Sequence, residues 1–174
     1  MGQKGSVMKA VKVSFEMWTI LLARALCVVA AVASVAAAQT EPRVGTWDLN
    51  LAKSTFSPEP PPKRQTLTFQ AAGPHWVALL QGTDASGMPI NPDMNNLAIN
   101  FDGKDHPTAN VNYDTTAWKR IDANTYQAIR KKAGKIVLTS TNVVSKDGKT
   151  MTITTKGVNA DGQSIHNVRV YDKR

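Results

Sequence analysis

The chain has 174 residues, a formal net charge of +8 and a single cysteine, so its length suits one domain and it cannot form an intramolecular disulfide. Four of the 21 basic residues and one of the 13 acidic residues precede position 39, which leaves a net charge of +5 on the rest of the chain. A charge this modest does not indicate a nucleic-acid partner.

The first 38 residues have the layout of a secretory signal peptide. Three lysines precede an apolar stretch over 17–38, which ends in three alanines before Gln39. A basic start, an apolar middle and a small-residue end predict export and cleavage near Ala38, which would place the remainder in the periplasm or outside the cell. The alternative is an uncleaved membrane anchor, since the apolar run is about long enough to span a bilayer.

The rest of the chain divides into a flexible leader over 39–42 and a single domain over 43–174. A first strand is expected over 43–50. The stretch over 51–62 contains four prolines, which cannot donate to a backbone ladder, so it is expected to be an extended surface connection. Alternating segments over 64–70 and 75–83 predict a hairpin, and the following stretch over 84–96 is expected to be a long loop.

From position 97 onward, alternating segments follow one another closely. Asp-Gly pairs at 102–103, 147–148 and 161–162 are strong hairpin signals. An irregular extended segment is expected over 106–114. The remaining strands are predicted over 97–101, 115–121, 125–132, 135–145, 149–157 and 164–172. The expected fold is therefore all-β, an antiparallel up-and-down meander of eight to nine strands that closes into a barrel. Such a barrel holds one small ligand or is filled by its own side chains.

Both ends of the predicted domain resemble known barrel families. Gly45 and Trp47 match the Gly-x-Trp signature of the lipocalins and the fatty-acid-binding proteins (the calycins), in which the glycine lets the strand bend and the tryptophan plugs the barrel end. The final strand is similar to the Arg-x-Tyr strand of fatty-acid-binding proteins. The stretch over 143–151 resembles uncharacterised secreted bacterial lipocalin-like proteins. The resemblance implies a lipocalin-like barrel in which Arg169 and Tyr171 hold a ligand carboxylate.

The residues themselves leave three alternatives for Arg169. It shares one strand face with Ile165, Asn167 and Tyr171, because alternate residues of a strand point the same way. It binds a ligand there, stacks on Trp47 to close the barrel, or is exposed to solvent. Trp118 is expected to line the interior and to contact a ligand there.

Other candidate sites are weak. The three histidines are far apart and have no metal-ligand spacing, so neither a metal nor a cofactor is predicted. Asp105 and His106 lack a neighbouring nucleophile, so no catalytic residue is assigned. Four basic residues flank a predicted hairpin tip, where they are solvated or dock onto an anionic surface: Arg130, Lys131, Lys132 and Lys135. No pattern of a nucleic-acid reader is present.

These observations predict a periplasmic protein that binds a small amphipathic or apolar molecule in a barrel cavity. The alternative is a cavity-free β-barrel that acts as an interaction module of the cell envelope. An enzyme on the same barrel is a third interpretation. The character of the inward face distinguishes the first two interpretations. Large inward side chains would fill the interior of an interaction module, whereas a binding protein would have an open cavity with one or two polar groups.

Overall fold

The computed structural model describes residues 41–73, 75–90 and 96–174. The predicted signal peptide over 1–38 lies outside these residues, as do positions 39 and 40 of the predicted leader. The described residues form eleven strands and one 3₁₀ turn, η1 (Leu51–Lys53), with no α-helix among them. None of them belongs to a helix with the length and apolar character needed to span a bilayer.

All eleven strands belong to one antiparallel sheet, as the sequence predicted. Its order is β4-β3-β2-β1-β11-β10-β9-β8-β7-β6, with β5 beside β3. The strand bounds are β1 (Gly45–Leu49), β2 (Arg64–Ala72), β3 (His75–Thr83), β4 (Pro89–Ile90), β5 (Asn96–Ile99), β6 (His106–Pro107), β7 (Thr115–Arg120), β8 (Thr125–Lys132), β9 (Lys135–Val144), β10 (Thr150–Val158) and β11 (Ser164–Lys173).

The strand count exceeds the predicted eight to nine because of two very short strands. Nine of the described strands have four residues or more, whereas β4 and β6 have two each. Strand β4 lies within the stretch expected to be a loop over 84–96, where Ile90 pairs with Gly82. Positions 91–95 of that predicted loop are outside the described residues.

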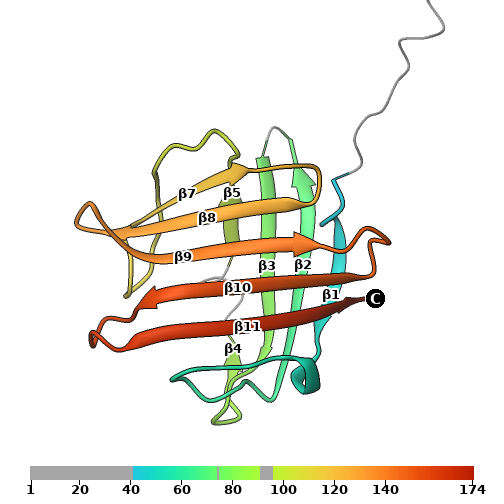
Figure 1. Ribbon diagram of the computed structural model, residues 1–174, viewed down its shortest axis with the longest axis horizontal. Coiled ribbons are helices and arrows are strands. Elements are labelled where there is room, and N and C mark those ends of the chain that lie inside the picture. The colour runs from blue at the N-terminus through green and yellow to red at the C-terminus, as the bar shows by residue number, and fades with distance from the viewer. Residues whose placement is uncertain (1–40, 74, 91–95) are drawn as a thin grey trace, which may run out of the picture. The chain divides into compact units, whose positions relative to one another are not determined.

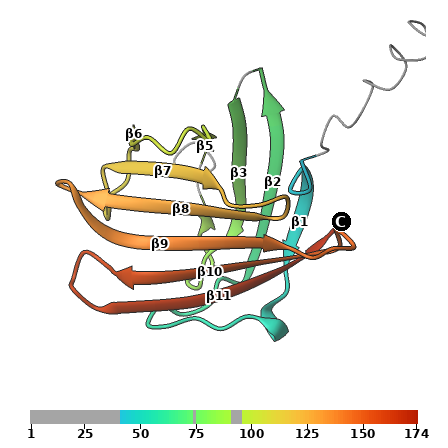
Figure 2. The ribbon, with the colours of Figure 1, turned by 45° about the horizontal axis from the view of Figure 1, so that its top comes forward.

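The sheet curls so that its two halves face each other. Strands β7 to β11 cross over β1, β2, β3 and β5 (Figures 1 and 2). One apolar core receives buried side chains from both halves, including Trp47, Phe69, Trp118 and Met151. Strand β1 pairs with the last strand, β11, which joins the two halves on one side.

The other side of the curled sheet is a seam rather than a continuous ladder. Among the described strands, no pairing connects β4 or β5 with β6 or β7. One backbone hydrogen bond spans this seam, from the Gly103 N–H to the Trp118 carbonyl oxygen at 3.0 Å. The Phe101 ring meets Trp118 edge-on, with 6.5 Å between centroids. The described strands therefore do not close into the barrel that the sequence predicted. The sheet stays open at this seam, and these contacts bridge it.

Glycines permit the tight curvature inside the long strands. Gly157 in β10 has a φ of 149°, and a Cβ atom there would lie 1.9 Å from the Val137 carbonyl oxygen. Only glycine accommodates such a close backbone approach. The neighbouring β8–β9 pair shifts register between Arg130 and Lys131, and bulges of this kind add local bend and twist to a sheet.

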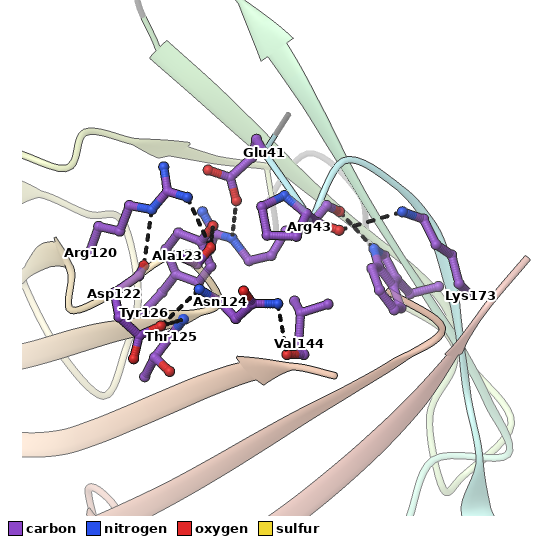
Figure 3. Close-up of polar contacts among 12 residues, drawn as sticks. Glu41, Arg43, Arg120, Asp122, Ala123, Asn124, Thr125, Tyr126, Val144 and Lys173 are labelled. Atoms are coloured by element: carbon purple, nitrogen blue, oxygen red, sulfur yellow. Dashed lines mark hydrogen bonds and ion pairs between the residues drawn. The ribbon is translucent and has the colours of Figure 1, made fainter. Parts of the chain in front are cut away.

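One end of the domain is closed by a cluster that begins at Glu41 (Figure 3). The Arg43 guanidinium is 1% exposed and its Nε donates to Glu41 Oε1 at 3.1 Å. The guanidinium carbon lies within 3.7–5.6 Å of four aromatic ring centroids: Phe69, Phe101, Trp118 and Tyr126. Glu41 therefore packs against the domain that the sequence placed at 43–174.

Trp47 is completely buried at the same end. Its indole Nε1 donates to the Arg43 carbonyl oxygen at 2.7 Å. Gly45, two residues earlier, has a φ of 122°, a conformation that side chains disfavour, and a Cβ there would meet Lys173 at 3.0 Å. The cation over the Trp47 ring is Lys173, with its Nζ 5.0 Å from the centroid. The alternative in which Arg169 stacks on Trp47 is therefore wrong.

Candidate functional site

A cavity of about 270 Å³ lies between the two halves of the curled sheet. Its apolar lining comes from both halves and includes Leu67, Leu80, Trp118 and Ile153. Phe69 and Trp118 line the cavity and also contact the Arg43 guanidinium, so these rings separate the cavity from the closed end. The domain is not filled by its own side chains.

The inward face of β11 supplies one polar wall. Ile165, Asn167, Arg169 and Tyr171 all line the cavity, because they alternate along the strand. The structure thus brings together the three residues singled out as ligand contacts, namely Arg169, Tyr171 and Trp118, around one cavity. Their alignment on one face follows directly from the period of two in the sequence.

The strand register extends this wall into two rows across β9, β10 and β11. In the first row, Ile153 pairs with Asn142 on one side and Arg169 on the other. In the second row, Thr155 stands between Ser140 and Asn167. The Ser140 and Thr155 hydroxyl oxygens are 2.9 Å apart. All six side chains line the cavity.

Arg130 also faces this cavity, which the sequence did not predict. It shares the inward face of β8 with the buried Tyr126 and Ala128. Its Nη1 donates to Ser140 Oγ at 2.7 Å, and its guanidinium carbon lies 5.3 Å from the Tyr113 ring centroid. Burial lowers the pKa of Arg130, and the nearby positive charge of Arg169 acts in the same direction. The guanidinium still stays charged at neutral pH.

Arg130 therefore does not belong to the predicted basic surface cluster. Lys131 points away from Arg130 and pairs with Asp105, with 2.7 Å between Nζ and Oδ2. Lys132 reaches the Val111 carbonyl oxygen at 3.4 Å. Lys135 is exposed. The run of basic residues suggested a single surface cluster, but alternate side chains of β8 point inward, and Arg130 is one of them.

The two arginines have no carboxylate partner. Among the residues that the structure describes, no ion pair includes Arg130 or Arg169. The Arg169 Nε is buried without a hydrogen-bond acceptor, and its guanidinium carbon lies 5.7 Å from the Phe56 ring centroid. Glu59 lines the cavity from an exposed position, so the titratable lining carries two positive charges against one negative charge.

Tyr171 is buried and already has a partner. Its hydroxyl donates to Gln65 Oε1 at 2.6 Å. Burial raises the pKa of the Tyr171 phenol to about 12, so the hydroxyl is protonated at neutral pH. Gln65 was not predicted as a cavity residue, although the alternation that places Leu67 and Phe69 inward also places Gln65 inward.

The proline-rich connection over 51–62 forms hydrogen bonds with β11. Thr55 forms a bridge with Val168 of β11, and the His166 N–H donates to the Ser57 carbonyl oxygen at 2.9 Å. The Ser57 N–H donates to Asn167 Oδ1 at 2.8 Å. These bonds hold the segment against β11 and bring Glu59 to the cavity lining.

The histidines lie elsewhere. His106 contacts Asp102 at 3.0 Å on an exposed turn, and His75 contacts Asn100 near the start of β3. Within the described ranges, no group of three metal-ligating side chains comes together.

Comparisons with known proteins assign no family. No family model matches the sequence, and no curated protein matches it. Among solved structures, the domain is similar to zebrafish ileal bile acid-binding protein complexed with cholic acid. The TM-score is 0.47 at 11% sequence identity, covering 76% of this chain and 99% of that chain.

Proposed function

We propose that this protein binds a small molecule with an apolar body and an anionic group inside the cavity between the two halves of the sheet. The observation that carries this proposal is the pair of arginines, Arg130 and Arg169, which face one cavity without a carboxylate partner. The buried Arg169 Nε, which lacks an acceptor, supports the same role.

Charge balance favours an anion. Burying a cation costs free energy unless an opposite charge or hydrogen bonds offset its lost hydration. An arginine guanidinium presents a planar fork of donors that matches a carboxylate or a similar oxyanion. In this proposal Arg169 is the principal anchor, and Arg130, which already donates to Ser140, contributes mainly its charge.

The rest of the lining favours an amphipathic ligand of modest size. Leu67, Leu80, Trp118 and Ile153 provide apolar contacts for its body. The cavity volume of about 270 Å³ lies just under the usual range of ligand pockets, which begins at about 300 Å³. A cavity of this kind disfavours the alternative of a filled barrel that serves only as an interaction module.

Isothermal titration calorimetry with octanoate and 1-octanol tests this function. We expect octanoate to bind more tightly than the alcohol, and Arg169→Met to weaken octanoate selectively by about 2–5 kcal/mol, as for the loss of one partner from a buried charge pair. Arg64→Met, which alters an exposed arginine of β2, is the matched control. Equal weakening of both probes would instead indicate that Arg169 only supports the barrel.

We further propose that binding takes place after export, on the basis of the signal-peptide layout of the first 38 residues. N-terminal sequencing of the protein from the periplasmic fraction should find a start at or near Gln39. Recovery of the chain in the membrane fraction with residues 17–38 intact would contradict export with cleavage.

A further inference from the structure

We infer that the ligand carries a hydroxyl group as well as its anionic group, and that this hydroxyl pairs with Asn142. The inference rests on the proposed function, because it assigns a second anchor point to the same ligand. It narrows the ligand class from amphipathic anions in general to compact hydroxylated acids.

Asn142 is an unusual member of the cavity wall. It lies on β9, lines the cavity and is 2% exposed, yet its side-chain Oδ1 is buried without a donor. Its polar neighbours are paired: Ser140 accepts from Arg130, and Asn167 accepts from the Ser57 N–H. A buried polar atom in a native protein normally has a partner, so a bound molecule that donates a hydrogen bond would complete this site.

The register places Asn142 at a useful distance from Arg169. Asn142 and Arg169 pair with opposite sides of Ile153, so they are two strand spacings apart in one row. At about 4.8 Å for each spacing, their Cα atoms are separated by roughly 10 Å. Ile153 lines the cavity between them. A ligand anchored by its anion at Arg169 therefore crosses an apolar residue before it reaches Asn142.

The chemistry at Asn142 favours a hydroxyl over other donors. An ammonium group would be repelled by the two cavity arginines, Arg130 and Arg169, which have no carboxylate partner of their own. A second carboxylate has no proton to donate to Oδ1 at neutral pH. A hydroxyl both donates and accepts, so it pairs with the asparagine amide in either orientation of that amide.

Isothermal titration calorimetry with 8-hydroxyoctanoate and octanoate measures the contribution of the hydroxyl. The wild-type protein should bind the hydroxy acid about two- to tenfold more tightly, the range expected for one net hydrogen bond. Asn142→Leu should abolish this preference, so that the two acids bind the variant with equal affinity. Asn112→Leu, which alters another asparagine of the lining, should retain the preference and serves as the matched control.

Asn142→Ala provides a second test if the leucine variant fails to fold, as judged by circular dichroism. Equal affinity of the wild-type protein for the two acids would overturn the inference, and so would a preference that survives in a folded Asn142 variant. Either result would leave the proposed function standing if octanoate binding still depended on Arg169. Failure of the wild-type protein to bind either acid would overturn both.

Discussion

Replacing Arg43 by alanine should strongly destabilise the domain. The change removes a guanidinium that is 1% exposed, and it leaves the Glu41 carboxylate, whose side chain is 5% exposed, without its partner. Removing one partner of a buried ion pair typically costs about 3–5 kcal/mol, mainly because the other charge remains buried and unpaired. The same substitution removes the contacts between the guanidinium and the aromatic rings. The range of about 3–5 kcal/mol includes the loss of these contacts.

A double substitution separates the charge from the packing. Glu41→Gln combined with Arg43→Met removes both charges and keeps most of the side-chain volume, so it should cost less than about half as much as Arg43→Ala. Urea unfolding followed by tryptophan fluorescence measures the free energy of unfolding of each variant. A loss below about 1 kcal/mol for Arg43→Ala would refute the reasoning, as would a double variant as unstable as the single one. Arg64→Ala, at an exposed site, should change stability by less than about 0.5 kcal/mol.

Further predictions concern the core and the response to pH. Trp47→Ala should destabilise by about 3–5 kcal/mol in the same urea assay, since the side chain is fully buried, and a loss under about 1 kcal/mol would contradict its role as an end plug. Gly157→Ala should lower the melting temperature, because its Cβ would collide with a backbone carbonyl, and an unchanged value would show that β10 can shift. The hydrogen bond from Arg174 lowers the pKa of Asp48. The stability that this contact adds is therefore present above pH 3.8 and is lost as acid protonates the folded carboxylate. Acid unfolding of Asp48→Asn should show a weaker dependence on pH below 3.8 than that of the wild-type protein. Burial raises the pKa of Tyr171 to about 12, so stability should fall as pH rises from 10 towards 12, and an ultraviolet titration in which every tyrosine ionises near pH 10 would exclude this burial.

The strands were predictable because their signals are local. Alternation placed Ile165, Asn167, Arg169 and Tyr171 on one face of β11, and the structure finds all four on the cavity wall. Asp-Gly pairs marked the turns that join β9 to β10 and β10 to β11. The short strand β4 was not predicted, because two residues are too few to show a period. Of the irregular extended segment expected over 106–114, only His106–Pro107 forms a strand, β6.

The missed features depend on contacts between distant parts of the chain. The sequence gives no sign that Glu41 and Arg43 bury an ion pair beneath rings from β2, β7 and β8. Arg130 was assigned to the surface because it opens a basic run, although the period that turns Tyr126 and Ala128 inward also turns Arg130 inward.

The unpaired Asn142 could not be recognised either, since a missing hydrogen bond is visible only when every neighbour is placed. The seam between β5 and β7 could not be predicted either. Local hairpin signals show which neighbouring strands pair, but they do not show whether the outermost strands of the sheet pair with each other.

Native mass spectrometry of the protein isolated under non-denaturing conditions from the cells that produce it tests the central claim most directly. We expect a retained small molecule at one copy per chain, acidic in character, which is released on unfolding and lost from Arg169→Met but kept by Arg64→Met. A protein that carries nothing and binds neither octanoate nor 8-hydroxyoctanoate, or one that retains a neutral molecule equally well without Arg169, would contradict the account.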